Sequence, residues 1–261
     1  MLTATGRMPL FVLGVCQMNL EAKIALSLLS KIMESRTKLW YLRNIDAFSN
    51  LNDEQVRMVD QYSTMREIKK GEMLYLEGSS DKNIYILKKG VVKITRLTPQ
   101  GREITLDIFK EDPIFGEMVF IDSEERNESA EVIEDGLICV MRWGDFDTPI
   151  KRMPNHSMQI TKMIGLRKCR IENKLLDMLF STVEQRLAKT LLNLLDDFGI
   201  PHKDGYLLKI KFTHKDFVHL IAYTRETVTT TLNKFKAEGI IDYEGKHVVI
   251  KSLDGIRTIA G

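Results

Sequence analysis

Residues 212–250, FTHKDFVHLIAYTRETVTTTLNKFKAEGIIDYEGKHVVI, constrain the fold more than any other segment, because two short helices and a β-hairpin are expected there in close succession. Thr213 is a candidate N-cap and Asp216 follows three residues later, as in a capping box, so a helix is expected to begin there. Thr224 can cap a second helix after a short interruption. Two strand-like runs joined by a glycine-containing turn follow within residues 240–250. The segment therefore predicts a winged helix-turn-helix.

The second helix is expected to have an apolar face and a polar face. Val228, Leu232 and Phe235 recur at i, i+4 and i+7 and would face inward. The opposite stripe is polar, and the first turn of such a helix contacts base edges, so double-stranded DNA is the expected partner. A small helical hairpin that only packs is the alternative. The candidate DNA-binding residues are Thr213, Lys215, Arg225, Glu226, Thr229, Thr230 and Lys234, with the two lysines as phosphate contacts.

Between about Ile45 and Trp143, short apolar runs punctuated by glycine predict an all-β region. The segment Thr98–Gly101 has proline second and glycine fourth, which is the signature of a turn that joins two strands into a hairpin. Strands at such regular spacing are typical of a sandwich, jelly roll or barrel whose mouth can hold a small ligand. A short helix starting near Leu51 would cover one end. The strand candidates are Met73–Leu76, Ile84–Leu87, Val91–Ile94 and Ile104–Phe109.

Asn155–Phe180 predicts one long helix, because it contains no proline and a single glycine, Gly165. An approximate heptad seam along it indicates pairing with a second copy of the chain, since DNA-binding proteins of this type bind paired half-sites as two-fold dimers. Arg167 and Lys174 occupy the remaining seam positions, so packing of the helix against its own domain alone is the alternative. The candidate dimerisation residues are Ile160, Ile164, Ile171 and Met178.

A further helix is predicted for Ser181–Phe198. Gly199 followed by Pro201 is a stop signal, so the helix is expected to end there. Residues 201–205 are then expected to form a surface loop that leads into the DNA-binding unit.

The cysteines and histidines argue against an enzyme or a metal protein. Cys16, Cys139 and Cys169 lie far apart, without the spacing of a zinc or iron–sulfur site, and fit a reducing cytosol. None of the five histidines lies in the β region, so a metal-dependent jelly-roll enzyme would lack imidazole ligands. No Walker loop, dinucleotide fingerprint or Ser/His/Asp arrangement is present. The sequence therefore predicts a cytoplasmic protein that holds no metal and is not an enzyme.

The N-terminal segment gives no targeting signal. No segment has the length of a transmembrane helix, so no membrane partner is expected. Residues 10–16 have the apolar character of a signal peptide but are too few, and Val15 is large for a cleavage site. Residues 1–32 are expected to form a helical extension or to reflect an over-long start, with Met18 and Met33 as alternative initiators.

The order of short strands, long helix and winged helix-turn-helix resembles the cyclic-AMP receptor protein and fumarate-nitrate reductase regulator (CRP/FNR) superfamily, over about Leu42 to Ile250. The most specific motifs are Phe115-Gly116-Glu117, Ser129-Ala130 and Thr224-Arg225-Glu226-Thr227-Val228. The resemblance implies an α+β chain with an N-terminal jelly-roll-like β-roll, a long dimerisation helix and a C-terminal winged helix-turn-helix. It also implies a homodimeric transcription regulator that binds a palindromic operator and contacts RNA polymerase. The expected parts are an N-terminal extension at 1–40, the effector-type β-roll at 41–150, the dimerisation helix at 151–180 and the DNA-binding domain at 181–261.

Two departures from the family pattern disfavour cyclic AMP as effector. In cyclic-nucleotide sensors of the family an Arg precedes the Ser/Thr-Ala pair and holds the phosphate, whereas Glu128 stands there in this chain and would repel a phosphate. Arg126 lies two residues earlier and could supply the missing charge. On the long helix, Ile171-Glu172 offers no hydroxyl pair to an adenine. A further departure, at the DNA-binding unit, is Ala222, which stands where helix-turn-helix turns often use glycine.

No cofactor is therefore predicted, although an unknown small-molecule effector stays possible. The sequence argues against the oxygen-sensing branch of the family, because the N-terminal cysteine cluster of that branch is absent. The alternative is a ligand-independent DNA-binding dimer whose β-roll is a platform for dimerisation and polymerase contact. The candidate effector-pocket residues are Gly116, Glu117, Arg126, Glu128, Ser129, Ala130, Arg167 and Ile171.

Overall fold

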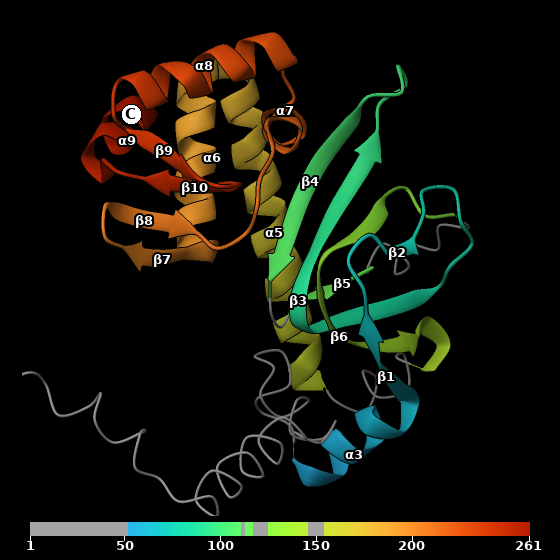
Figure 1. Cartoon of the computed structure of the whole chain (residues 1–261). Coiled ribbons are helices and arrows are strands. Elements are labelled where there is room, and N and C mark those ends of the chain that lie inside the picture. The colour runs from blue at the N-terminus through green and yellow to red at the C-terminus, as the bar shows by residue number, and fades with distance from the viewer. Residues whose placement is uncertain (1–51, 111–112, 117–124, 146–153) are drawn as a thin grey trace, which may run out of the picture.

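The computed structural model describes residues 52–110, 113–116, 125–145 and 154–261, except for some helical side chains, including those of 154–160 (Figure 1). A β-rich part and a mainly helical C-terminal part lie side by side, and the long helix α5 (Pro154–Phe180) runs along both. The expected extension at 1–40 and its helix lie outside the described residues.

The β-rich part is one antiparallel sheet of six strands rolled on itself. Its order is β1-β6-β3-β4, with β2 paired to β6 and β5 paired to β3. The helix α3 (Asp53–Tyr62) precedes it, close to the short helix expected from the sequence. The strands are β1 (Ser63–Ile68), β2 (Met73–Tyr75), β3 (Asn83–Leu97), β4 (Glu103–Lys110), β5 (Ile114–Phe115) and β6 (Ser129–Arg142).

The strand β3 corrects one sequence prediction. Two strands separated by a turn at Gly90 were expected, but a single strand passes through that glycine with shifts of register against β6. Gly90 has φ +98, and a Cβ there would lie 2.9 Å from the backbone of Gly136 on the neighbouring strand. The glycine therefore permits a close approach of two strands rather than a reversal of the chain.

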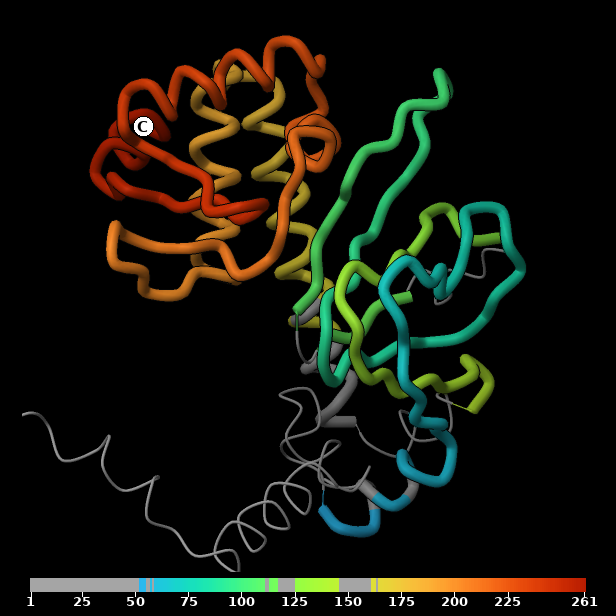
Figure 2. Tube along the Cα trace, viewed as in Figure 1, coloured from blue at the N-terminus to red at the C-terminus, as the bar shows by residue number. Residues whose placement is uncertain are grey.

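The turn at Thr98–Gly101 is confirmed. It joins β3 to β4, with Gly101 N–H donating to Thr98 O at 2.8 Å. β4 lies beside the C-terminal part (Figure 2). Glu103 of β4 contacts His219 there, with 3.0 Å between Oε1 and Nδ1. The strands β1 and β6 had not been predicted, because charged residues interrupt their apolar pattern; β6 carries Glu131, Glu134 and Asp135.

The C-terminal part combines four helices with a four-stranded sheet of order β7-β8-β10-β9. Its core holds fully buried side chains such as Leu187, Phe217 and Phe235, each of which stabilises the fold by about 1.5–3 kcal/mol relative to exposure. The elements are α6 (Val183–Phe198), β7 (Gly199–His202), β8 (Gly205–Leu208), α7 (His214–Ile221), α8 (Arg225–Ala237), β9 (Ile241–Glu244), β10 (His247–Ile250) and α9 (Leu253–Ala260).

The predicted surface loop at residues 201–205 is wrong. The helix α6 ends before Gly199 as expected, but the chain then forms the hairpin β7–β8, in which Pro201 pairs with Tyr206. Proline is tolerated here because β7 is an edge strand, which has a neighbouring strand on one side only, so the sheet does not lose a hydrogen bond through the missing N–H donor.

Candidate functional site

The two helices α7 and α8 begin at the caps expected from the sequence. Thr213 accepts a hydrogen bond from Asp216 N–H at 3.3 Å, and its own N–H donates to the Asp216 carboxylate at 2.7 Å. Thr224 caps α8 by accepting from Thr227 N–H at 3.4 Å. Between the helices Ala222 has φ 53 and ψ 51, the left-handed conformation that favours glycine. These local features set the angle at which α8 leaves the turn.

The helix α8 presents a polar face to solvent. Val228, Leu232 and Phe235 are fully buried against α6 and α7, as the spacing predicted. Arg225 and Glu226 in the first turn are exposed, as is Thr230 one turn later. An exposed polar helix face held by a capped helix pair has the geometry of a recognition helix.

Of the other candidate DNA-binding residues, Thr213, Thr229 and Lys234 make contacts within the protein. Thr229 is half-buried, and its Oγ1 lies 3.2 Å from Nδ1 of His214 on α7. Lys234 donates to Glu184 of α6 at 2.6 Å, while both side chains stay largely exposed. Thr213 uses its hydroxyl in the cap, and Lys215 is exposed.

The wing follows α8. It consists of β9, a turn in which Gly245 has φ 61, and β10. Tyr243 of β9 lies with its Oη 3.5 Å from Nε2 of His214, so the wing and α7 are connected through one imidazole. Sequence patterns had placed the wing but not this contact, because His214 and Tyr243 are brought together only by the packing of the sheet on the helices.

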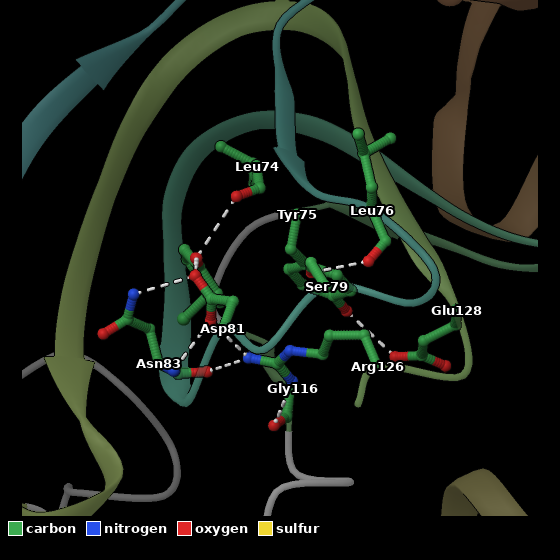
Figure 3. A network of polar contacts seen from close by, with 10 residues as sticks. Leu74, Tyr75, Leu76, Ser79, Asp81, Asn83, Gly116, Arg126 and Glu128 are labelled. Carbon is green, nitrogen blue, oxygen red and sulfur yellow. Dashed lines mark hydrogen bonds and ion pairs between the residues drawn. The ribbon is translucent and has the colours of Figure 1, made fainter. Parts of the chain in front are cut away.

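Arg126 of the candidate effector pocket lies within a buried polar network (Figure 3). Its guanidinium donates to Asp81 Oδ1 at 2.8 Å, to Gly116 O at 2.8 Å and to the carbonyl oxygen of Asn83. Its Cζ lies 4.3 Å from the ring centroid of Tyr75. The guanidinium is thus neutralised by a carboxylate of the protein and covered on one face by an aromatic ring.

Asp81 is the anion of this network. Burial opposes its ionisation, but hydrogen bonds from Arg126, from the Asn83 backbone and from Tyr85 outweigh that effect and hold the pKa of Asp81 below its usual range. Tyr85 Oη donates to Asp81 Oδ2 at 2.8 Å, and burial followed by this carboxylate raises the pKa of Tyr85. Neither Asp81 nor Tyr85 was a candidate site residue in the sequence analysis. Asp81 lies 45 positions before Arg126, and no local sequence pattern indicates that the two residues pair.

Glu128 is buried beside this network but has its own partners. Its Oε1 accepts a hydrogen bond from Tyr75 Oη at 2.9 Å. Its Oε2 forms an ion pair at 3.3 Å with Arg167, which projects from α5. The Arg167 guanidinium in turn lies 5.3 Å from the ring centroid of Phe109. Glu128 therefore connects the sheet to the long helix.

The remaining candidate pocket residues divide into two groups. Gly116 is buried with φ +81, and a Cβ there would lie 3.1 Å from the Arg126 guanidinium. Ser129 Oγ accepts from Glu77 N–H at 2.9 Å, and Ala130 is fully buried in the sheet. Ile171 is apart from these residues: it is 49% exposed and lines a cavity of about 440 Å³ between β4, α5 and α6. Glu117 lies outside the described residues.

The helix α5 has two different faces. Ile164, Ile171 and Leu175 are 39%, 49% and 55% exposed and form an apolar stripe, to which Met178 is adjacent on the helix. The side chain of Ile160 lies outside the described part of the structure. Arg167 and Lys174, which the sequence placed in the seam, instead contact the β-rich part: Lys174 Nζ donates to Thr105 O at 2.5 Å. The two charged residues in the predicted seam are therefore explained by their contacts with the β-rich part.

Two further observations concern metal sites and membrane-spanning helices. Within the ranges that the structure describes, no three metal-binding side chains come together. None of the helices in the same ranges combines the length and apolar character needed to cross a membrane.

Comparisons with known proteins match both parts of the chain. Residues 65–152 match a family model described as the cyclic nucleotide-binding domain, and residues 185–259 match one described as the Crp-like helix-turn-helix domain. Both matches agree with the strands and helices described above.

Curated relatives extend over most of the chain. The CRP-like cAMP-activated global transcriptional regulator of Mycobacterium tuberculosis is 33% identical over 181 residues, which are 69% of this chain and 81% of the relative. The anaerobic regulatory protein of Bacillus subtilis is 27% identical over 204 residues, 77% of this chain and 86% of that protein. The solved structure of the c-di-GMP responsive global regulator CLP of Xanthomonas campestris shares the fold, with a TM-score of 0.68 and 20% identity over 77% of this chain and all of that one. The chain therefore belongs to the CRP/FNR family of helix-turn-helix transcription regulators and is not an enzyme.

Proposed function

We propose that the protein is a homodimeric regulator that binds a palindromic DNA site through α8 and does not depend on cyclic AMP. The observation that carries the proposal is the exposed polar face of α8, held outward by the caps at Thr213 and Thr224 and by a buried apolar face. We further propose the division of the chain given by its sequence: an extension at 1–40, the β-roll at 41–150, the dimerisation helix at 151–180 and the DNA-binding domain at 181–261.

Base recognition is assigned to the first turn of α8. Arg225 can donate a bidentate pair to guanine, and Glu226 can accept from the amino group of cytosine. Both side chains are exposed, so they can enter a major groove without rearrangement. Thr230 faces the same side, whereas Lys215 and Lys234 are suited to phosphate contacts at the edge of the interface.

The apolar stripe of α5 is the proposed dimer contact. Exposed apolar side chains spaced along one helix face lose water contact when the same face of a second copy pairs with them. A two-fold dimer would carry two copies of α8, and so would match an inverted repeat in DNA. Leu175 belongs to this stripe although the sequence analysis did not include it.

Cyclic AMP is not the proposed effector. The names of relatives include a cAMP-activated regulator and an anaerobic regulatory protein, so membership of the family does not identify the signal. In this chain Arg126 is neutralised by Asp81, and Glu128 places a carboxylate beside it. A phosphodiester entering here would have to displace two existing ion pairs, Arg126 with Asp81 and Glu128 with Arg167.

RNA polymerase is the proposed protein partner and the cytoplasm the proposed location. Both proposals are supported by the family of transcription regulators to which the chain belongs.

Selection of bound DNA from a random pool tests the proposed function directly. We expect enrichment of a sequence with two inverted half-sites whose centres lie about 34–36 Å apart, which is one turn of the duplex. The selected site should form a complex with two protein chains in sedimentation. Failure to enrich any sequence above random DNA, or binding of a single chain to one half-site, would contradict the proposal.

A further inference from the structure

We propose that the ion pair between Glu128 and Arg167 holds α5 against the β-roll without any effector, so that the regulator binds its operator in the absence of a small molecule. This inference rests on the proposed function. It concerns the regulation of the same protein. In this proposal the Glu128–Arg167 ion pair connects the β-roll to α5, so no bound effector is needed to connect them.

The surroundings of the pair favour a persistent contact. The side chains of Arg167 and Glu128 are 14% and 5% exposed, so water and salt screen them little. Tyr75 donates to the second carboxylate oxygen of Glu128 at 2.9 Å, and the Arg167 guanidinium lies over the ring of Phe109 at 5.3 Å. Removal of either charge would take an ion-pair partner from the other in a poorly solvated place, which is unfavourable.

A second contact lies two helical turns further along α5. Lys174 follows Arg167 by seven residues and therefore projects from the same face of the helix. Its Nζ donates to Thr105 O of β4 at 2.5 Å. The helix is thus fixed to the β-roll at two points, which determines its rotation about its own axis.

The rotation of α5 matters because its other face carries the proposed dimer contact. With Arg167 and Lys174 turned toward the sheet, Ile164 and Ile171 are left exposed on the neighbouring face. After α5 ends at Phe180, the chain passes through Ser181 and the N-cap Thr182 into α6, which packs against α7 and α8. The ion pair therefore acts on DNA binding by positioning α5, and Glu128 and Arg167 are positioning residues.

A charge-reversal cycle tests this role on the full-length dimer. The protein is unfolded and refolded to remove small molecules, and the affinity of each variant for the selected operator is measured by fluorescence anisotropy. We expect the stripped wild-type protein to bind the operator, and Glu128→Arg and Arg167→Glu each to bind at least tenfold more weakly. The double reversal, Glu128→Arg with Arg167→Glu, should recover affinity to within about threefold of wild type, which a merely structural role of either residue would not produce.

Lys168→Glu is the matched control, because Lys168 is the next residue on α5 but is largely exposed and pairs with Glu172. It should change operator affinity less than twofold. Should the reversals fail to fold, Glu128→Gln, Arg167→Gln and their double variant provide the same cycle: effects that do not add support the pair, and effects that add in full overturn it.

The outcomes separate the inference from the proposed function. Single variants that bind like wild type, or a double reversal no better than the singles, would overturn the inference alone. A wild-type protein that binds its operator only after a small molecule is added would do the same. A wild-type protein that selects no DNA sequence would overturn the proposed function, and this inference with it.

Discussion

His214 on α7 and Thr229 on α8 share a hydrogen bond, with 3.2 Å between Nδ1 and Oγ1. The same imidazole lies with Nε2 3.5 Å from Tyr243 Oη in the wing, so one side chain connects both helices and the β-hairpin. The hydroxyl of Thr229 is therefore directed toward the protein, while Glu226 and Thr230 remain exposed. Fewer side chains are therefore available for base recognition than the sequence analysis expected, because the Thr229 hydroxyl is bonded within the protein.

Replacement of Glu226 or Arg225 by Ala should weaken binding to the selected operator by about 1–3 kcal/mol, because each would lose a hydrogen-bonded base contact. Base preference should relax at one position in each half-site. Competition between the operator and its single-base variants measures both effects.

Thr229→Val is the comparison for this prediction. It removes the hydroxyl that contacts His214, so it should lower the free energy of unfolding by about 1 kcal/mol and leave base preference unchanged. Equal loss of affinity for the operator and for random DNA in the Glu226 and Arg225 variants would contradict base recognition by these residues. Lys215→Ala should mainly reduce the salt dependence of binding.

Ile164→Glu and Ile171→Glu should each give a folded monomer, because a carboxylate in the apolar dimer contact would lose its hydration on pairing. Sedimentation velocity measures the state of association, and circular dichroism checks that the helices are retained. Leu166→Glu is the control, since Leu166 is 57% exposed on the opposite side of α5. A dimer that survives both isoleucine variants would exclude this face as the contact.

Ala222→Gly should raise the free energy of unfolding by roughly 0.5–1 kcal/mol. Ala222 has φ 53, and the steric penalty of a Cβ in the left-handed region exceeds the extra chain entropy that glycine has when unfolded. Urea unfolding measures the change. Asn193→Gly in the exposed middle of α6 should instead destabilise, because the backbone there is helical. A destabilised Ala222→Gly protein would mean that the turn tolerates alanine without strain.

Local sequence signals predicted the DNA-binding unit well, for physical reasons that these positions illustrate. A helix cap such as Thr213 needs partners only three residues away, and the conformation of Ala222 follows from the turn between two adjacent helices. The continuity of β3 through Gly90 could not be predicted in the same way. It depends on Gly136, which lies far along the chain and leaves space for the close approach.

The contacts in the candidate effector pocket also join residues that are far apart in the sequence, so they could not be predicted from local patterns. The substitution at Glu128 was visible in the sequence, and Arg167 was a candidate both for the dimer seam and for the effector pocket. Heptad spacing could not decide between these positions, because residues three and four apart lie on neighbouring faces of one helix, and the ion pair of Arg167 with Glu128 was not predicted. The ion-pair partner of Arg126 could not be predicted either, because Asp81 lies on a separate loop before β3. Pairings of this kind follow from the tertiary fold alone.

Cyclic AMP should not bind the wild-type protein at micromolar concentrations, and it should leave operator affinity unchanged. The carboxylate of Glu128 gives a phosphodiester no attraction and is paired with Arg167, and Arg126 is already neutralised by Asp81. Glu128→Arg should raise nucleotide affinity at least tenfold in calorimetry, whereas Glu125→Arg, in the same loop but exposed, should not. Micromolar binding to the unmodified protein with a matching gain in operator affinity would contradict the prediction and make Arg126 the phosphate partner.

Lys174, which is half-buried on α5, should make stability depend on pH in the alkaline range. Burial lowers the pKa of Lys174 from 10.5 to about 8, although the nearby charge of Asp107 opposes this shift. Between these two values the unfolded chain binds more protons at this site than the folded protein, so the free energy of unfolding should rise with pH from about 8 toward 10. Urea unfolding at several pH values, with Lys174→Met subtracted from wild type, isolates this contribution. Lys168→Met is the control, because it removes an exposed lysine whose pKa is raised by Glu172. The difference in unfolding free energy between wild type and this variant should change with pH in the opposite direction. A difference for Lys174→Met that does not change with pH would show that the Lys174 ammonium is solvated in the folded protein.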